Sequence, residues 1–118
     1  MQYGLLFILG DLAHTVPHTG AKGINLAIPD MRMPACALEA ICNGGSTERL
    51  EHYVGVCLRR LWKVQRFSWW VTPLMRRFDE HKPFDLGRQI DEIGYLTSSR
   101  STMTTWSENC MGLPMEWG

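Results

Sequence analysis

Residues 10–27 read GDLAHTVPHTGAKGINLA, with a carboxylate near one end and two glycines at the start of a helical pattern near the other. The apolar run 5–9 that precedes this segment predicts a short buried strand ending at Gly10. Asp11 would then stand at the carboxyl end of the strand, where α/β proteins form ligand crevices. A carboxylate in that place is a suitable acceptor for a ribitol or ribose hydroxyl.

The far end of the segment predicts a helix start that is open to a planar ligand. Gly20 and Gly23 flank this start, and without Cβ atoms they let a flat ring approach the backbone. Free amides around Ile24 and Asn25 would point outward with the positive end of the helix dipole, and Lys22 adds a full charge. The pattern favours a flat ring that becomes anionic when reduced, such as an isoalloxazine.

Each of these residues also has a simpler interpretation. Asp11 could cap a helix or turn, the glycines could serve ordinary turns, and Lys22 could be a solvated lysine. His14 is expected to orient the turn rather than to act as an acid or base. His14 and His18 have the spacing of a metal pair, but they flank Pro17 in a loop without a third ligand, so no metal is expected.

The combination of strand, Gly-Asp-x-Ala-His, proline and glycine-flanked helix start resembles the second flavin motif of the class A FAD-dependent aromatic hydroxylases. Three further blocks resemble the same family in the same order. These are CLRRLWK at 57–63, RFSWW at 66–70, and the tail with EN at 108–109 and GLP at 112–114. The resemblance covers essentially the whole chain, and it is specific because separated blocks agree.

The resemblance implies which residues hold FAD and which lie beside the substrate. Asp11 would hold a hydroxyl of the FAD sugar chain, and the backbone of Ile24 and Asn25 would bind the flavin pyrimidine edge. The full cofactor-binding set is Asp11, Pro17, Gly20, Lys22, Gly23, Ile24 and Asn25. The residues expected near the substrate are His18, Thr19 and Ala21. The family uses FAD, with NADPH as co-substrate, to hydroxylate a phenolic acid such as 4-hydroxybenzoate.

Two residues depart from the family pattern. His18 stands where the family has a second proline whose carbonyl lies beside the substrate hydroxyl, so the rigidity of proline is lost. Cys110 stands where the family has a tyrosine that helps to deprotonate the substrate, and a thiol is a poorer donor than a phenol. No catalytic residue is therefore assigned, and efficient hydroxylation is not expected.

The fold expected for residues 1–118 is mainly α, with one short strand, a glycine-rich turn and three or four helices, as the carboxy-terminal portion of an α/β FAD-binding monooxygenase. The amino-terminal half of the family carries a GxGxxG turn, which is absent here, so the isolated chain is expected to be inactive. Helices are predicted from Ala21, with Pro29 and Pro34 interrupting or kinking the pattern, and then over 47–78, 86–96 and 102–108.

Composition limits the possible partners. Twelve basic and twelve acidic residues cancel, which gives no general attraction to nucleic acid or to a membrane. Four irregularly spaced cysteines predict reduced thiols in a cytoplasmic protein. Trp62, Trp69 and Trp70 are expected in the core or in a buried interface, either of a homodimer or with a missing amino-terminal half. The alternative function is a binding or assembly module that uses the basic, tryptophan-rich helix 47–78.

Overall fold

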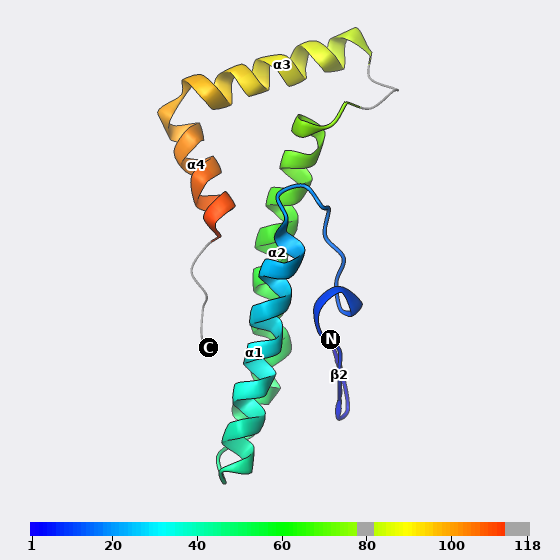
Figure 1. The fold of residues 1–118 in the computed structure, drawn as a ribbon, viewed down its shortest axis with the longest axis vertical. Helices are drawn as coiled ribbons and strands as arrows, with labels where there is room; N and C mark the ends of the chain where they lie inside the picture. Colours follow the sequence, from blue (N-terminus) through cyan, green and yellow to red (C-terminus); the bar gives the residue numbers. More distant parts are fainter. Residues whose placement is uncertain (78–81, 113–118) are drawn as a thin grey trace.

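The computed structural model describes residues 1–77 and 82–112, and four helices dominate it. Helices α1 (Lys22–Cys42) and α2 (Glu48–Met75) form an antiparallel hairpin, while α3 (Pro83–Ser98) and α4 (Arg100–Met111) form a hook at one end of it. Figure 1 shows the first twenty residues lying along the side of this hairpin. The mainly α architecture agrees with the expectation from sequence.

The amino-terminal apolar run does not form the expected buried strand. It contributes only β2 (Leu6–Phe7), which pairs antiparallel with β1 (Gln2–Tyr3) around Gly4 at φ +56°. The register joins Gln2 to Phe7 and Tyr3 to Leu6. Leu5 is 95% exposed and Leu6 is 64% exposed. The prediction of a single buried strand over 5–9 was therefore wrong, because among the described residues only β1 pairs with this segment.

Helix α1 continues through both of its prolines. The buried side chains recur every three or four residues along one face, at Lys22, Leu26, Asp30, Pro34 and Ala37. Each proline removes one backbone hydrogen bond, but the remaining bonds and the packing against α2 keep the helix intact. The predicted interruption was wrong, the alternative of a kink at the prolines stays a prediction, and the helix starts one residue later than expected.

Helix α2 confirms the predicted long helix, with bounds at 48–75 instead of 47–78, and the predicted last residue lies outside the described residues. Ser46 caps its start by accepting a hydrogen bond from the Glu48 amide at 3.0 Å. The chain reverses before it at Gly45, where a Cβ would meet the Ala40 carbonyl oxygen at 2.7 Å. Glycine is needed at this turn because only hydrogen fits between the two backbones.

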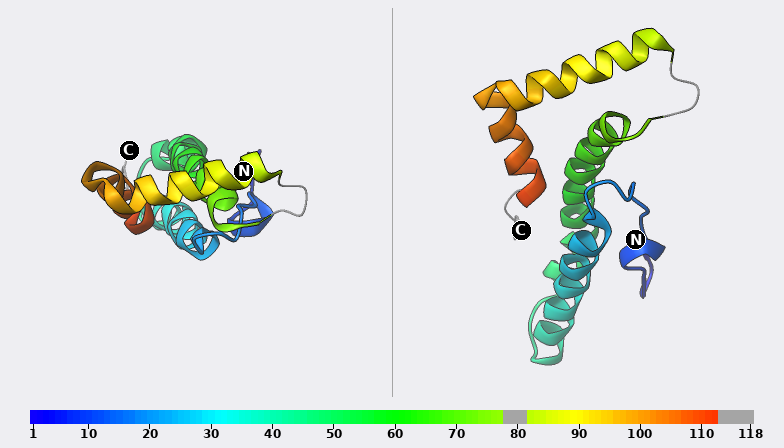
Figure 2. Two further views of the ribbon diagram at one scale, coloured as in Figure 1. Left: turned by 90° about the horizontal axis from the view of Figure 1, so that it is seen from above. Right: turned by 45° about the horizontal axis from the view of Figure 1, so that its top comes forward.

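The hook confirms the two predicted carboxy-terminal helices with longer bounds. Helix α4 returns toward α2 and inserts Trp106 against Phe67 and Trp70. The ring centroids of this aromatic cluster are 5.6–6.0 Å apart in edge-to-face arrangements. At the other end of α3, the Gln89 amide donates to the carbonyls of Pro73 and Leu74, which end α2. Figure 2 shows the resulting open hook from two further directions.

Two of the three tryptophans expected in the core lie on the surface. Trp62 is 69% exposed and Trp69 is 70% exposed, whereas Trp70 is partly buried. The core interpretation was wrong for the first two, because they point away from the α1 face of α2. An interface with another polypeptide stays a prediction for them.

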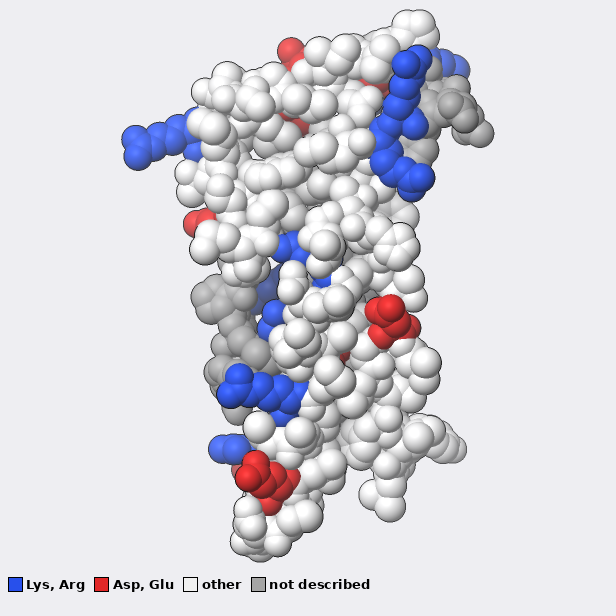
Figure 3. Space-filling view, in the orientation of Figure 1, with Lys and Arg blue, Asp and Glu red and all other residues white. Residues whose placement is uncertain are grey.

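Helix α1 carries a second exposed apolar surface, which we call the α1 stripe. Its members are exposed by half or more of their side-chain surface and repeat at helical spacing: Ile24, Ile28, Met31 and Leu38. Figure 3 has the orientation of Figure 1, in which α1 lies in front of α2, and few charged residues lie on the surface that it shows. No helix within 1–77 and 82–112 has the length and apolar character needed to cross a membrane.

Candidate functional site

The expected ribityl-binding carboxylate, Asp11, lies on a single 3₁₀ turn, Gly10–Leu12. Gly10 adopts φ +61°, a conformation that side chains disfavour, and its carbonyl accepts the amides of Ala13 and His14 at 2.9 and 3.1 Å. This turn leaves the Asp11 side chain exposed. The carboxylate is therefore available to a ligand.

The start of α1 is an uncapped helix N-terminus. Gly20 and Ala21 adopt positive φ values of 87° and 50°, so the chain turns sharply before Lys22. No side chain caps this start, and the amides of the first turn face outward without an intrahelical acceptor. Gly23 and Ile24 thus present backbone donors at the positive end of the helix dipole, and Asn25 is the first residue whose amide falls within the helical hydrogen-bond pattern.

The carboxylate and the helix start lie next to each other. A Cβ added at Gly23 would lie 3.8 Å from the Asp11 Oδ1 atom. A side chain at this position would fill the space between the acceptor and the amide donors, whereas glycine leaves it open. The structure thus places these two groups, twelve residues apart in sequence, on one small surface that combines an acceptor with donors.

Lys22 is buried rather than solvated, with 5% of its surface exposed. Its ammonium group donates to the Cys110 carbonyl and lies 5.7 Å from the centre of the Phe67 ring. The structure therefore brings the tail of α4 against the start of α1. The Cys110 thiol itself is exposed.

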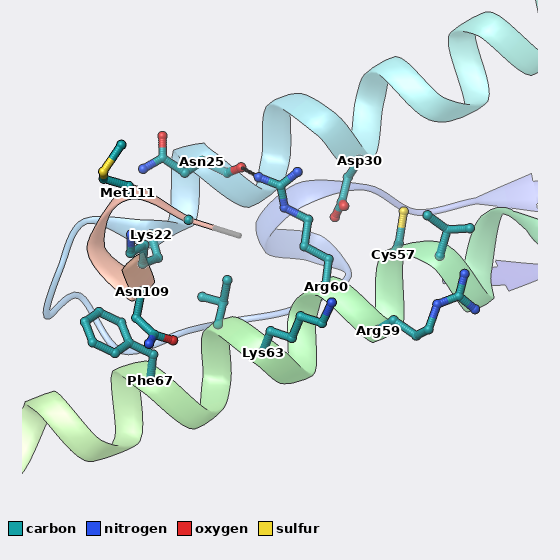
Figure 4. A pocket seen from close by; sticks show the side chains of 13 residues that line it. Lys22, Asn25, Asp30, Cys57, Arg59, Arg60, Lys63, Phe67, Asn109 and Met111 are labelled. Carbon is teal, nitrogen blue, oxygen red and sulfur yellow. Dashed lines mark hydrogen bonds between the residues drawn. The ribbon is translucent and has the colours of Figure 1, made fainter. Parts of the chain in front are cut away.

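A cavity of about 200 Å³ lies between the start of α1, the middle of α2 and the end of α4 (Figure 4). Lys22 and Asn25 line it from α1, and Asn109 and Met111 line it from α4. Its α2 wall is basic, with Arg59, Arg60 and Lys63. Asp30 is the one acidic residue in the lining among the described residues. The cavity therefore carries an excess of positive charge beside the uncapped helix start.

The basic side of α2 is partly engaged within the chain. Arg60 donates to the Asn25 carbonyl at 3.1 Å, and Arg66 donates to the Asn109 side chain at 2.7 Å. These contacts tie α2 to the helix start and to α4. Part of the predicted basic face thus serves the fold instead of forming an open surface.

The loop between Asp11 and the helix start is fixed by contacts to α2. Thr15 offers its carbonyl to the Gln65 amide at 2.9 Å, and the Thr19 hydroxyl accepts from Thr72 at 3.0 Å. His18 is exposed, and its carbonyl accepts the Ala21 amide at 3.0 Å. The His18 carbonyl thus closes the turn before α1. Pro17, partly buried, lies between these anchors.

His14 makes a buried contact that the sequence did not indicate. Its Nε2 atom lies 2.5 Å from the Asp30 Oδ2 atom, and the two side chains are only 3% and 2% exposed. This contact agrees with a structural role for His14 in orienting the turn. Asp30 was missed because nothing in a helical pattern marks a polar residue whose partner lies sixteen residues away.

Comparison with known proteins identifies the class to which this fold and site belong. Residues 1–68 match the family model described as FAD binding domain, which is more than half of the chain. The chain belongs to this family of FAD-binding proteins.

One curated relative makes the relationship more specific. The chain is 44% identical over 116 residues to p-hydroxybenzoate hydroxylase of Acinetobacter baylyi. The similar region covers 98% of this chain and 29% of that relative, so the chain spans less than a third of the relative's length. The resemblance to the aromatic hydroxylases is confirmed, and the chain is a homologue of part of such an enzyme.

Proposed function

We propose that the chain forms one wall of the FAD site of a monooxygenase that hydroxylates a phenolic acid such as 4-hydroxybenzoate, with NADPH as the reductant. The single observation that carries this proposal is the approach of the Asp11 carboxylate to the uncapped start of α1 at Gly23. A hydroxylated chain and a ring with acceptor edges both find partners there. The similarity to p-hydroxybenzoate hydroxylase supports the same assignment.

Within this wall, each residue has a distinct task. Asp11 accepts a ribityl hydroxyl, and the backbone at Ile24 and Asn25 binds the pyrimidine edge of the flavin. Gly20 and Gly23 keep the surface open, while the buried charge of Lys22 adds to the positive potential that favours a reduced, anionic ring. Bound FAD would supply the redox chemistry, accepting hydride from NADPH and reducing oxygen.

The substrate side of the wall follows the loop. Pro17 stiffens the loop beside the flavin, and His18, Thr19 and Ala21 face the phenolic acid. Because His18 and Cys110 stand where the resemblance expects a proline and a tyrosine, this wall offers a thiol instead of a phenol at the place expected to take the substrate proton. The proposed activity of the isolated chain is therefore FAD binding without efficient hydroxylation.

The size of the cavity supports a shared site. Pockets for small molecules usually hold about 300–1,000 Å³, and the cavity here is about 200 Å³. The chain also covers 29% of its relative. We propose that the rest of an FAD-binding fold completes the site and covers the α1 stripe, whose exposed apolar side chains begin at Ile24 beside the helix start.

A flavin titration tests the proposal. Asp11→Ala removes the ribityl acceptor, so FAD affinity should fall about tenfold, the usual value of one charge-assisted hydrogen bond. Flavin fluorescence quenching at increasing concentrations of the chain measures the dissociation constant, with circular dichroism as the test of folding. Asp91→Ala is the matched control, because Asp91 is an exposed aspartate on α3, away from the site.

Two outcomes would contradict the proposal. One is a folded wild-type chain that leaves flavin fluorescence unchanged even at high protein concentration. The other is an Asp11→Ala variant that binds FAD as tightly as the Asp91→Ala control.

A further inference from the structure

The buried pair of His14 and Asp30 connects the two halves of the proposed flavin wall. His14 follows the 3₁₀ turn that carries Asp11, and its amide donates to Gly10 at 3.1 Å. Asp30 lies two turns into α1, on the helix whose start presents the backbone donors. The 2.5 Å contact between the two side chains therefore holds the turn against α1.

The environment of Asp30 makes it an acceptor surrounded by donors. The His14 Nδ1 atom is buried and has no hydrogen-bond partner among the described residues, which favours the tautomer that carries its proton on Nε2. The Cys57 thiol lies within hydrogen-bonding range of the Asp30 carboxylate, and burial raises the pKa of Cys57 to about 12. The Tyr53 hydroxyl lies beside the Cys57 thiol and donates to the Ile8 carbonyl at 3.4 Å, and Arg60 is a nearby cation on α2.

Other contacts to the loop are weaker or more exposed. The Gln65 contact to Thr15 lies at the surface, and the Thr72 contact to Thr19 is a partly buried bond between neutral hydroxyls. A hydrogen bond to a carboxylate is stronger than either, and burial increases that difference. Among the described residues, the His14–Asp30 pair is thus the buried charged contact that joins the turn directly to α1.

We propose that Asp30, acting through His14, is a positioning residue that sets FAD affinity by holding the Asp11 turn in register with the start of α1. Asp30 touches no flavin in this assignment. The proposal rests on the proposed function, since it concerns the geometry of the same flavin wall. It adds Asp30 as a residue that affects FAD binding indirectly, through the position of the Asp11 turn.

Four variants separate positioning from simple stabilisation. His14→Ala and Asp30→Asn weaken or remove the charged contact, whereas His14→Gln keeps an N–H donor close to the place of Nε2. Gln89→Ala is the matched control, because Gln89 holds the end of α2 far from the turn. Each variant is titrated with FAD at a temperature where circular dichroism shows it folded.

The expected result is a loss of about tenfold or more in FAD affinity for His14→Ala and Asp30→Asn, with His14→Gln within about threefold of the wild type. Gln89→Ala should lower the melting temperature and leave FAD affinity unchanged. If His14→Ala and Asp30→Asn melt earlier but bind FAD like the wild type, the pair is structural only and the proposal is overturned.

A second measurement keeps this proposal separate from the proposed function. If the folded wild type binds no FAD, the proposed function fails for the isolated chain. Amide hydrogen exchange of residues 10–20 then decides the positioning role. Asp30→Asn should speed exchange in this segment while leaving α3 unchanged, and an unchanged rate over 10–20 would overturn the proposal.

Discussion

The cysteine beside Asp30 differs sharply in chemistry from the other thiols. Burial is the largest cause that raises the pKa of Cys57 from 9.0 to about 12, and the Asp30 charge adds to it. The thiol therefore stays protonated and unreactive at neutral pH. Cys42 and Cys110 are exposed and should react with an alkylating reagent first.

The raised pKa of Cys57 predicts a loss of stability in alkaline solution. The folded chain keeps a proton that the unfolded chain releases above pH 9, so the free energy of unfolding should fall as the pH rises from about 9 to about 12. Urea unfolding at pH 8 and pH 11 measures this change. Cys57→Ala should make the dependence shallower, and an equal dependence in both proteins would contradict the assignment.

The proximity of Asp11 to the start of α1 could be predicted from the local sequence, but the distant partners of these residues could not. Asp11 on its 3₁₀ turn lies at most twelve residues from Gly20 and Gly23 at the start of α1, so spacing along the chain indicates that a carboxylate lies near an open helix start. The burial of Lys22 depends on α4, and its contact joins residues 88 apart. Asp30 likewise depends on the docking of the loop on α1. Such contacts follow from tertiary packing, which spacing along the chain does not encode.

Helix α4 contacts the hairpin through the aromatic ring of Trp106, besides the hydrogen bonds of Lys22 to the Cys110 carbonyl and of Arg66 to Asn109. Trp106 packs its ring against Phe67 and Trp70 and is itself partly buried. Trp106→Ala should cost on the order of 2 kcal/mol at this contact and release α4 from α2. Amide hydrogen exchange over residues 100–111 should then rise at least about tenfold.

A control separates undocking from a general effect on α4. Met103 is on the same helix and is 45% exposed, so Met103→Ala should leave the exchange of residues 100–111 close to that of the wild type. Equal exchange in Trp106→Ala and Met103→Ala would show that the aromatic cluster does not hold the helix.

The elements that sequence predicted well are those with long periodic patterns. Helix α2 was placed within a few residues because its apolar positions repeat over seven turns. The strand at residues 5–9 failed because an apolar run indicates burial only where other strands cover it. The interruption at Pro29 and Pro34 failed because packing along α1 outweighs two missing hydrogen bonds.

The whole molecule is far more open than a globular chain of its length. Its radius of gyration is 18.3 Å, whereas a compact domain of this length has about 13.5 Å. Its accessible surface is 8561 Å², about 2,000 Å² above the value of about 6,500 Å² expected for its mass. An excess of this size is typical of a subunit that loses surface to a large interface.

Small-angle scattering measures this openness directly. The monomeric chain should give a radius of gyration near 18 Å, close to that of the structure. A value near 13.5 Å would mean that α3 and α4 fold back on the hairpin in solution. The measurement needs concentrations at which light scattering shows a monomer, because the exposed α1 stripe favours association.

The aromatic cluster also gives the molecule an optical property. The Trp70 and Trp106 rings lie 5.7 Å apart with planes at 65°, so their electronic transitions are close enough to couple and do not share one plane. Two identical chromophores in this relation share their excitation, and the shared states absorb left- and right-circularly polarised light unequally. The circular dichroism spectrum of the unlabelled chain should therefore show a pair of tryptophan bands of opposite sign when α4 is docked. Among the described ring contacts, no other pair of tryptophans would produce such bands.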